Sequence, residues 1–127
     1  MIILDTIVWI EYLRNNHEYY FIISPLLERN EVMAVECIFG ELLQGVKNKY
    51  EEEMILNYWK YLPKKKYDEI IIEAGNYANK NKLSDQGVGL IDAIILMHGI
   101  KSNSKIWTID KKFRRIIPEE LKYIGSE

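Results

Sequence analysis

Short apolar runs alternate with longer segments of helical periodicity along this chain, and this alternation is the strongest constraint on its fold. The runs at residues 1–4, 31–35, 105–108 and 121–124 have the length and composition of buried strands. Strands that alternate with helices predict a mostly parallel sheet of four to five strands, covered on both faces in a three-layer α/β/α sandwich. Helices are expected at residues 6–14, 21–29, 37–46, 51–62, 67–82, 90–100 and 110–117.

The size and composition of the chain indicate a single domain over residues 1–127. Of these residues 48% are hydrophobic and 28% are charged, which is ordinary for a globular protein. The net charge of −2 gives no overall attraction to nucleic acid, so binding of a polyanion needs a local basic patch. The one cysteine, Cys37, excludes an internal disulfide, and no apolar run reaches the roughly 20 residues of a membrane span. We therefore expect a cytoplasmic protein without membrane contact.

Four acidic residues lie where such a fold can direct them to one place. Asp5 and Asp110 follow strand-like runs, and parallel sheets bind ligands beyond the carboxyl ends of their strands. Glu41 and Asp92 lie on apolar helical segments, where a charge without a partner is costly. Crowded carboxylates repel one another unless a cation neutralises them. Because oxygen ligands suit Mg²⁺ and Mg²⁺ suits phosphate chemistry, the four acids indicate a metal-dependent site.

Each acid also has an ordinary structural explanation. Asp5 and Asp110 can cap the helices that follow them. Asp92 can interact favourably with the dipole of its helix, and Glu41 can be a solvated helix residue. Capping and metal binding are compatible for the same side chain. His98, on an apolar helix, is expected to be a packed histidine rather than a general base.

The four acids lie in longer motifs that occur in a fixed order. These motifs are ILDTIVWIEYLR, GELLQG, GLIDAIILMHG and WTIDKKF. In order, spacing and total length they resemble the PIN domain, and especially the VapC-like ribonuclease toxins of toxin–antitoxin pairs. The resemblance implies a hydrolase in which the four acids bind Mg²⁺ or Mn²⁺ and activate water for endonucleolytic cleavage of RNA. It also implies that the hydroxyl groups of Thr6 and Thr108 support the acids beside them.

The same resemblance implies partners for the protein. The chain is expected to be the toxin half of a type II toxin–antitoxin pair, to bind a cognate antitoxin over its early helices, and to form a homodimer. Aromatic residues concentrate at Trp9, Tyr12 and residues 19–21, and such density can form a groove for a partner. Two other functions stay open: a catalytically silent module that binds RNA or protein, and a metal phosphohydrolase that acts on DNA or small phosphoesters.

A cluster of basic residues follows the last of the four acids. It consists of Lys111, Lys112, Arg114 and Arg115. If the acids lie at the edge of the sheet, these side chains flank the site and can hold RNA phosphates. A solvated helix face explains the same cluster equally well.

Overall fold

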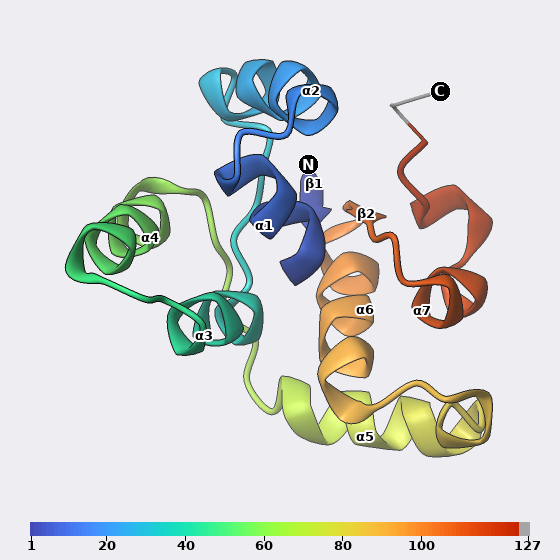
Figure 1. The fold of residues 1–127 in the computed structure, drawn as a ribbon. Helices are drawn as coiled ribbons and strands as arrows, with labels where there is room; N and C mark the ends of the chain where they lie inside the picture. The colour runs from blue at the N-terminus through green and yellow to red at the C-terminus, as the bar shows by residue number, and fades with distance from the viewer. Residues whose placement is uncertain (125–127) are drawn as a thin grey trace.

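Two short parallel strands lie side by side at the centre of the fold (Figure 1). The structure is a computed structural model, and it describes residues 1–124. Strand β1 (Ile2–Leu4) pairs with strand β2 (Lys105–Trp107) in parallel register. Ile3 and Leu4 point to opposite faces of the sheet, and both are completely buried, so protein covers both faces. The expected parallel sheet between helical layers is confirmed.

Three isolated parallel bridges extend this pair of strands on both sides. They join Ile2 to Val32, Ala34 to Lys64, and Ile106 to Lys122. The spatial order is therefore residue 64, residues 32–34, β1, β2 and residue 122. From β1 the chain moves outward on one side and then returns to β2 on the other. The order thus reverses between β1 and β2, which is where ligands bind in open parallel sheets.

The outer strands are less regular than the sequence predicts, since the run at 31–35 forms two isolated bridges and the run at 121–124 forms one. Pro63 lies beside residue 34 and accepts a hydrogen bond from the Ala34 N–H, but it has no N–H of its own to continue a ladder. At the carboxyl end, Pro118 precedes a short 3₁₀ helix, η2 (Glu119–Leu121), and residue 122 is left as the pairing residue.

Seven α-helices surround the sheet within residues 1–124. They are α1 (Thr6–Leu13), α2 (His17–Glu28), α3 (Glu36–Gln44), α4 (Lys49–Tyr61), α5 (Ile70–Lys80), α6 (Leu90–Ser102) and α7 (Lys111–Ile116). A 3₁₀ turn, η1 (Ser84–Gln86), precedes α6. Helix α2 begins at residue 17 instead of 21 and continues through Pro25. Asn15 and Asn30 follow the ends of α1 and α2 in the left-handed region, which asparagine tolerates better than most residues.

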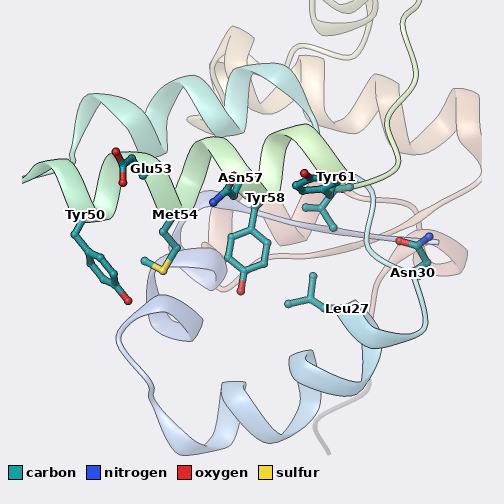
Figure 2. Close-up of a pocket in the computed structure, with 9 residues that line it drawn as sticks. Leu27, Asn30, Tyr50, Glu53, Met54, Asn57, Tyr58 and Tyr61 are labelled. Atoms are coloured by element: carbon teal, nitrogen blue, oxygen red, sulfur yellow. The ribbon is translucent and has the colours of Figure 1, made fainter.

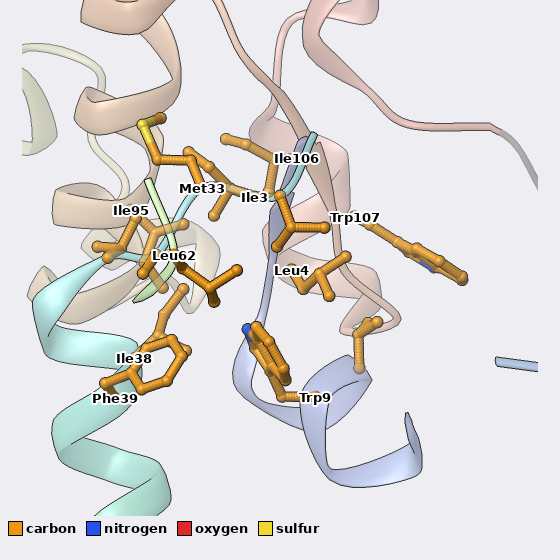
Figure 3. Packing of buried hydrophobic residues seen from close by; sticks show 14 of the residues in the cluster. Ile3, Leu4, Trp9, Met33, Ile38, Phe39, Leu62, Ile95, Ile106 and Trp107 are labelled. Carbon is orange, nitrogen blue, oxygen red and sulfur yellow. The ribbon is translucent and has the colours of Figure 1, made fainter. Parts of the chain in front are cut away.

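The main hydrophobic core joins the helices to the sheet around Trp9 (Figure 3). Trp9 on α1 is 1% exposed and packs edge-on against Phe39 on α3, with their ring centroids 5.3 Å apart. Burying side chains of this size stabilises the fold by roughly 1.5–3 kcal/mol each. A smaller cluster, which includes Ala74 and Ala93, packs α5 against α6. Because the main core contains both Ile3 and Leu121, the first elements of the described chain are held against its last ones.

Gly99 allows a close contact between α6 and β2. A Cβ at this position would lie 2.7 Å from Ile106 Cδ1 and 3.3 Å from the Ser104 carbonyl oxygen, so a side chain here would require its neighbours to shift. Glycine therefore permits this contact on α6, the helix that carries Asp92 near its start. Within residues 1–124, no helix combines the length and the apolar composition needed to cross a membrane.

Candidate active site

Asp5 is the acid held most firmly by the fold. It follows β1 where the order of the segments reverses, and its N–H donates to the Trp107 carbonyl at 3.0 Å. Its Oδ1 accepts a hydrogen bond from the Thr6 N–H at 2.8 Å and so caps α1. Its Oδ2 accepts from the Thr108 hydroxyl at 2.7 Å. The side chain is buried, so both carboxylate oxygens are fixed in one orientation.

Asp110 lies next to Asp5 through a shared contact with Thr108. The Asp110 N–H donates to Thr108 Oγ1 at 3.1 Å, while the Thr108 hydroxyl donates to Asp5. Asp110 Oδ1 caps α7 by accepting from the N–H groups of Lys112 at 2.9 Å and Phe113 at 3.3 Å. The capping explanation is therefore correct for Asp5 and Asp110, and it leaves Asp110 Oδ2 for another ligand.

Glu41 reaches the same area from α3. It lies on an exposed part of that helix, and its Oε1 accepts a hydrogen bond of 2.6 Å from the Thr6 hydroxyl. Thr6 thus contacts two of the four acids, because its backbone N–H is bonded to Asp5. Thr6, through its hydroxyl and its N–H, and Thr108, through its hydroxyl, link Glu41, Asp5 and Asp110 into one hydrogen-bonded chain.

Asp92, the third residue of α6, completes the group electrostatically. Burial, followed by the charges of Asp5, Asp110 and Glu41, raises the pKa of Asp92 to about 6. Burial also raises the pKa of Asp5, although its hydrogen bonds from Thr108 and Thr6 oppose that increase. The charges of Glu41 and Asp110 then raise the pKa of Asp5 further. All four acids are therefore near enough to repel one another, and a cation between them would relieve that repulsion.

The acids do not form a ready-made cage for an ion. Across residues 1–124, no three His, Cys, Asp or Glu side chains converge closely enough to hold a metal among themselves. Both oxygens of Asp5 are engaged by the protein, and one oxygen each of Asp110 and Glu41 is engaged. Asp92 accepts no hydrogen bond from the described residues. A site of this kind fits Mg²⁺, which is usually held by one or two carboxylates and keeps several waters.

Cys37 lies beside this acidic group, a placement that we did not predict from the sequence. Burial raises the pKa of Cys37 to about 12, with further contributions from the charges of Glu41 and Asp5. A thiol with this pKa stays protonated and does not act as a nucleophile. The spacing contained a signal, because residues 37 and 41 are four apart and share one face of a helix. His98 is buried, as expected, and its ring packs edge-on against Tyr67.

The basic residues of α7 follow Asp110 directly. Lys111, Lys112 and Arg115 are exposed and Arg114 is half-buried; none of the four forms an ion pair with another residue in the range 1–124. The side chain of Lys112 crosses Gly87, with its Cδ 3.0 Å from where a Cβ would lie. It is thereby directed toward the turn that leads into α6.

A family model for the PIN domain matches residues 2–117. The chain belongs to the PIN domain family. This PIN domain is similar in fold to VapBC2 from Rickettsia felis, whose crystal structure contains a DNA fragment from the promoter of that pair. The two chains share 24% sequence identity with a TM-score of 0.69, and the match covers 96% of each. A comparison with curated proteins finds no match.

The PIN domain also has a hollow between α2 and α4 (Figure 2). Its volume is about 570 Å³, and none of the four acids lines it. Tyr58 projects into it from α4, and the Tyr58 hydroxyl lies 3.0 Å from the Tyr12 hydroxyl on α1. Tyr50 and Tyr61 lie along its edge and are 75% and 73% exposed. This hollow is thus separate from the acids, and its aromatic lining suits apolar side chains of a partner.

Proposed function

We propose that this PIN domain is a divalent-metal-dependent endoribonuclease and the toxin of a type II toxin–antitoxin pair. The observation that carries the proposal is the gathering of the acids at the carboxyl ends of β1 and β2, where hydrogen bonds through Thr6 and Thr108 join Glu41, Asp5 and Asp110. The charges of these three acids also contribute to the raised pKa of Asp92. Repulsion between carboxylates destabilises the folded protein. A cation that binds between them relieves this repulsion and so binds more tightly. Family membership supports the same reading.

Asp5, Asp92 and Asp110 would hold Mg²⁺ or Mn²⁺ partly through bound waters, because the described acids do not converge on one point, and Glu41 would bind the ion directly or through water. The bound cation supplies a lowered pKa for attacking water and neutralises charge that develops on the scissile phosphate. Asp92 is suited to direct contact because neither of its oxygens is bonded to a described residue. Thr6 and Thr108 would position the other carboxylates through the hydrogen bonds that they donate.

The basic residues of α7 would bind the RNA backbone. Lys111, Lys112, Arg114 and Arg115 are within a few residues of Asp110, and they are free of ion pairs among residues 1–124. Contacts of this kind hold phosphates at a given distance from the acids without reading the bases. They also supply the local positive charge that a chain with a net charge of −2 needs to attract RNA.

A cognate antitoxin is the proposed protein partner, and the hollow between α2 and α4 is its proposed docking groove. Its aromatic lining and exposed tyrosines support this, as does the likeness in fold to a protein solved as VapBC2. A homodimer is also proposed, and it would cover apolar side chains such as Ile71 and Ile72, which are 56% and 71% exposed on α5. The lone, unpaired Cys37 is consistent with a cytoplasmic location.

The deciding experiment compares Asp92→Asn with the parent protein. Each is incubated with single-stranded RNA and Mn²⁺, and Asp68→Asn, which alters an exposed acid on another part of the chain, is the matched control. We expect the parent and Asp68→Asn to cut RNA and Asp92→Asn to lose at least about a hundredfold in rate, because it loses a metal ligand. Parent-like cleavage by Asp92→Asn would contradict the assignment.

Parallel reactions separate the two alternative functions. RNA that is protected from an added nuclease but never cut by the parent protein would indicate a silent binding module. Faster cleavage of DNA or of a small phosphoester than of RNA under the same metal condition would indicate a phosphohydrolase. A metal held by carboxylates can act on RNA, DNA or a small phosphoester, so this comparison of substrates decides the RNA assignment.

A further inference from the structure

A second, smaller pocket opens directly beside Glu41. It lies between α1, α3 and α4 and has a volume of about 240 Å³. Its apolar surface comes from all three helices and includes Ile10, Leu42 and Met54. Because Glu41 also forms part of its lining, this pocket and the acidic group share a side chain. We refer to it below as the Glu41 pocket.

The loop that closes one end of the Glu41 pocket is fixed by hydrogen bonds. Glu51 Oε1 accepts from the Lys47 N–H at 2.8 Å, and Asn48 Oδ1 accepts from the Glu51 N–H at 2.9 Å. These bonds cap α4 and hold the preceding residues in place. The pocket is therefore largely formed before any ligand enters, which lowers the entropic cost of binding.

Two positive charges lie at the Glu41 pocket. Arg14 and Lys47 line it and are exposed, and neither forms an ion pair with any residue from 1 to 124. The two acids of the pocket are partly engaged, since Glu41 accepts from Thr6 and Glu51 accepts from a backbone N–H. An apolar hollow with free cations at its edge is complementary to a ligand that joins a flat apolar body to a phosphate.

We propose that the Glu41 pocket is a nucleobase subsite, which receives one unstacked base of the RNA strand close to the phosphate that is cut. This proposal rests on the proposed ribonuclease function. Single-stranded RNA is recognised mainly through bases that leave the stack, and apolar side chains can enclose such a base. Arg14 and Lys47 would bind the phosphates on either side of it, while the acids act on the scissile bond.

The size and position of the pocket favour a base over a peptide segment. Sites for drug-sized ligands usually have volumes of about 300–1,000 Å³, so a pocket of about 240 Å³ suits one ring system rather than the face of a helix. The tyrosine-rich hollow between α2 and α4 is more than twice as large and offers a peptide more room. A ligand in the Glu41 pocket also lies beside an acid of the candidate active site, as a nucleotide of the substrate must.

Gly45→Leu tests the proposal by filling the pocket. Gly45 lines it with φ of −94°, and a Cβ there would meet only the carbonyl oxygens of Leu42 and Glu41 at 3.8 and 3.9 Å, which are ordinary contacts. The added side chain therefore has room to occupy the hollow without strain on the backbone. Gly75→Leu makes the same change on α5, where a Cβ meets nothing within 4 Å, and serves as the matched control.

The probes are fluorescent single-stranded homopolymers of A, C, G and U, together with an abasic ribose-phosphate oligomer of the same length. Affinities are measured by fluorescence anisotropy in EDTA, and cleavage of the same probes is measured separately in Mn²⁺. We expect the parent protein and Gly75→Leu to bind at least one homopolymer about tenfold more tightly than the abasic oligomer. For Gly45→Leu this ratio should fall close to one.

The two measurements separate failure of the subsite from failure of the ribonuclease function. If the parent protein binds every homopolymer no better than the abasic oligomer, or if Gly45→Leu keeps the parent ratio, the subsite proposal is overturned, whether or not RNA is cut. Retention of the ratio by Gly45→Leu would leave the pocket to a side chain of a protein partner. Base-dependent binding that Gly45→Leu abolishes, without cleavage in Mn²⁺, would support the subsite and overturn the ribonuclease.

Discussion

The Thr108 hydroxyl donates a 2.7 Å hydrogen bond to Asp5 Oδ2 although the two residues are 103 positions apart in the chain. Thr108 Oγ1 also accepts a hydrogen bond from the Asp110 N–H at 3.1 Å. One buried hydroxyl thus fixes the relative position of two of the four acids.

Thr108→Val removes this hydroxyl while it keeps the shape of the side chain. Asp5 Oδ2 then loses its donor in a buried setting, and we expect the free energy of unfolding to fall by about 1–3 kcal/mol. Urea denaturation measures the change. Thr108→Ser keeps a hydroxyl and should recover most of the loss; equal losses in the two variants would mean that the methyl group matters more than the hydrogen bond.

Without metal, the protein should lose stability as the pH rises through the titration of Asp92. Its pKa is raised to about 6 in the fold, from an ordinary value of 3.8, so the folded state favours the protonated acid. The stabilisation is complete below about pH 4 and is lost as the pH rises through 6. In EDTA we expect the melting temperature of the parent to fall over this range relative to that of Asp92→Asn, which has no such group.

Adding Mg²⁺ at pH 7 should raise the melting temperature of the parent protein, because an ion that binds only the folded state stabilises it. The increase should grow with ion concentration and be much smaller in Asp92→Asn. Equal stabilisation of both proteins would place the ion elsewhere.

Gly99→Ala should loosen the contact between α6 and β2. The new methyl group would lie 2.7 Å from Ile106 Cδ1, and relief of this overlap in a packed core is expected to cost about 1–3 kcal/mol. Equilibrium unfolding in urea measures the loss. Ile106→Val removes the Cδ1 atom, so the double variant should lose less than the sum of the two single ones. Strict additivity would show that the clash is relieved in another way.

Lys111→Ala and Arg115→Ala should weaken RNA binding with little dependence on sequence, because the side chains are assigned to phosphates. Each should lower the slope of log affinity against log salt by about one. A salt titration of RNA binding in EDTA measures this slope. Lys80→Ala, which removes an exposed lysine from the end of α5, is the control. A fall of the same size in the control would mean that only net charge matters.

The sheet and the order of its elements could be predicted because they depend on local pattern. The apolar runs before Asp5 and before Asp110 are short, and each is followed at once by helical spacing, which leaves a buried parallel strand as the simplest interpretation. The same pattern placed both acids at the carboxyl ends of strands. Once the two strands are taken to be parallel, both acids must lie at the same edge of the sheet.

The remaining details depend on contacts between distant segments, which periodicity does not encode. The run at 31–35 reads as a strand, but its neighbour is Pro63, whose missing N–H limits the ladder. The placement of Asp92 at the sheet edge depends on how α6 packs on β2, and one contact in that packing is between Gly99 and Ile106. The Glu41 pocket depends on the loop before α4, whose hydrogen bonds could not be inferred from composition.

The pairing of β1 with β2 has a consequence for synthesis of the protein in the cell. Asp5 leaves the ribosome about a hundred residues before its partner Thr108. A growing polypeptide therefore cannot assemble these carboxylates until the segment around β2 has emerged from the exit tunnel. Until then, Asp5 has no Thr108 hydroxyl to hold it and no Asp110 beside it.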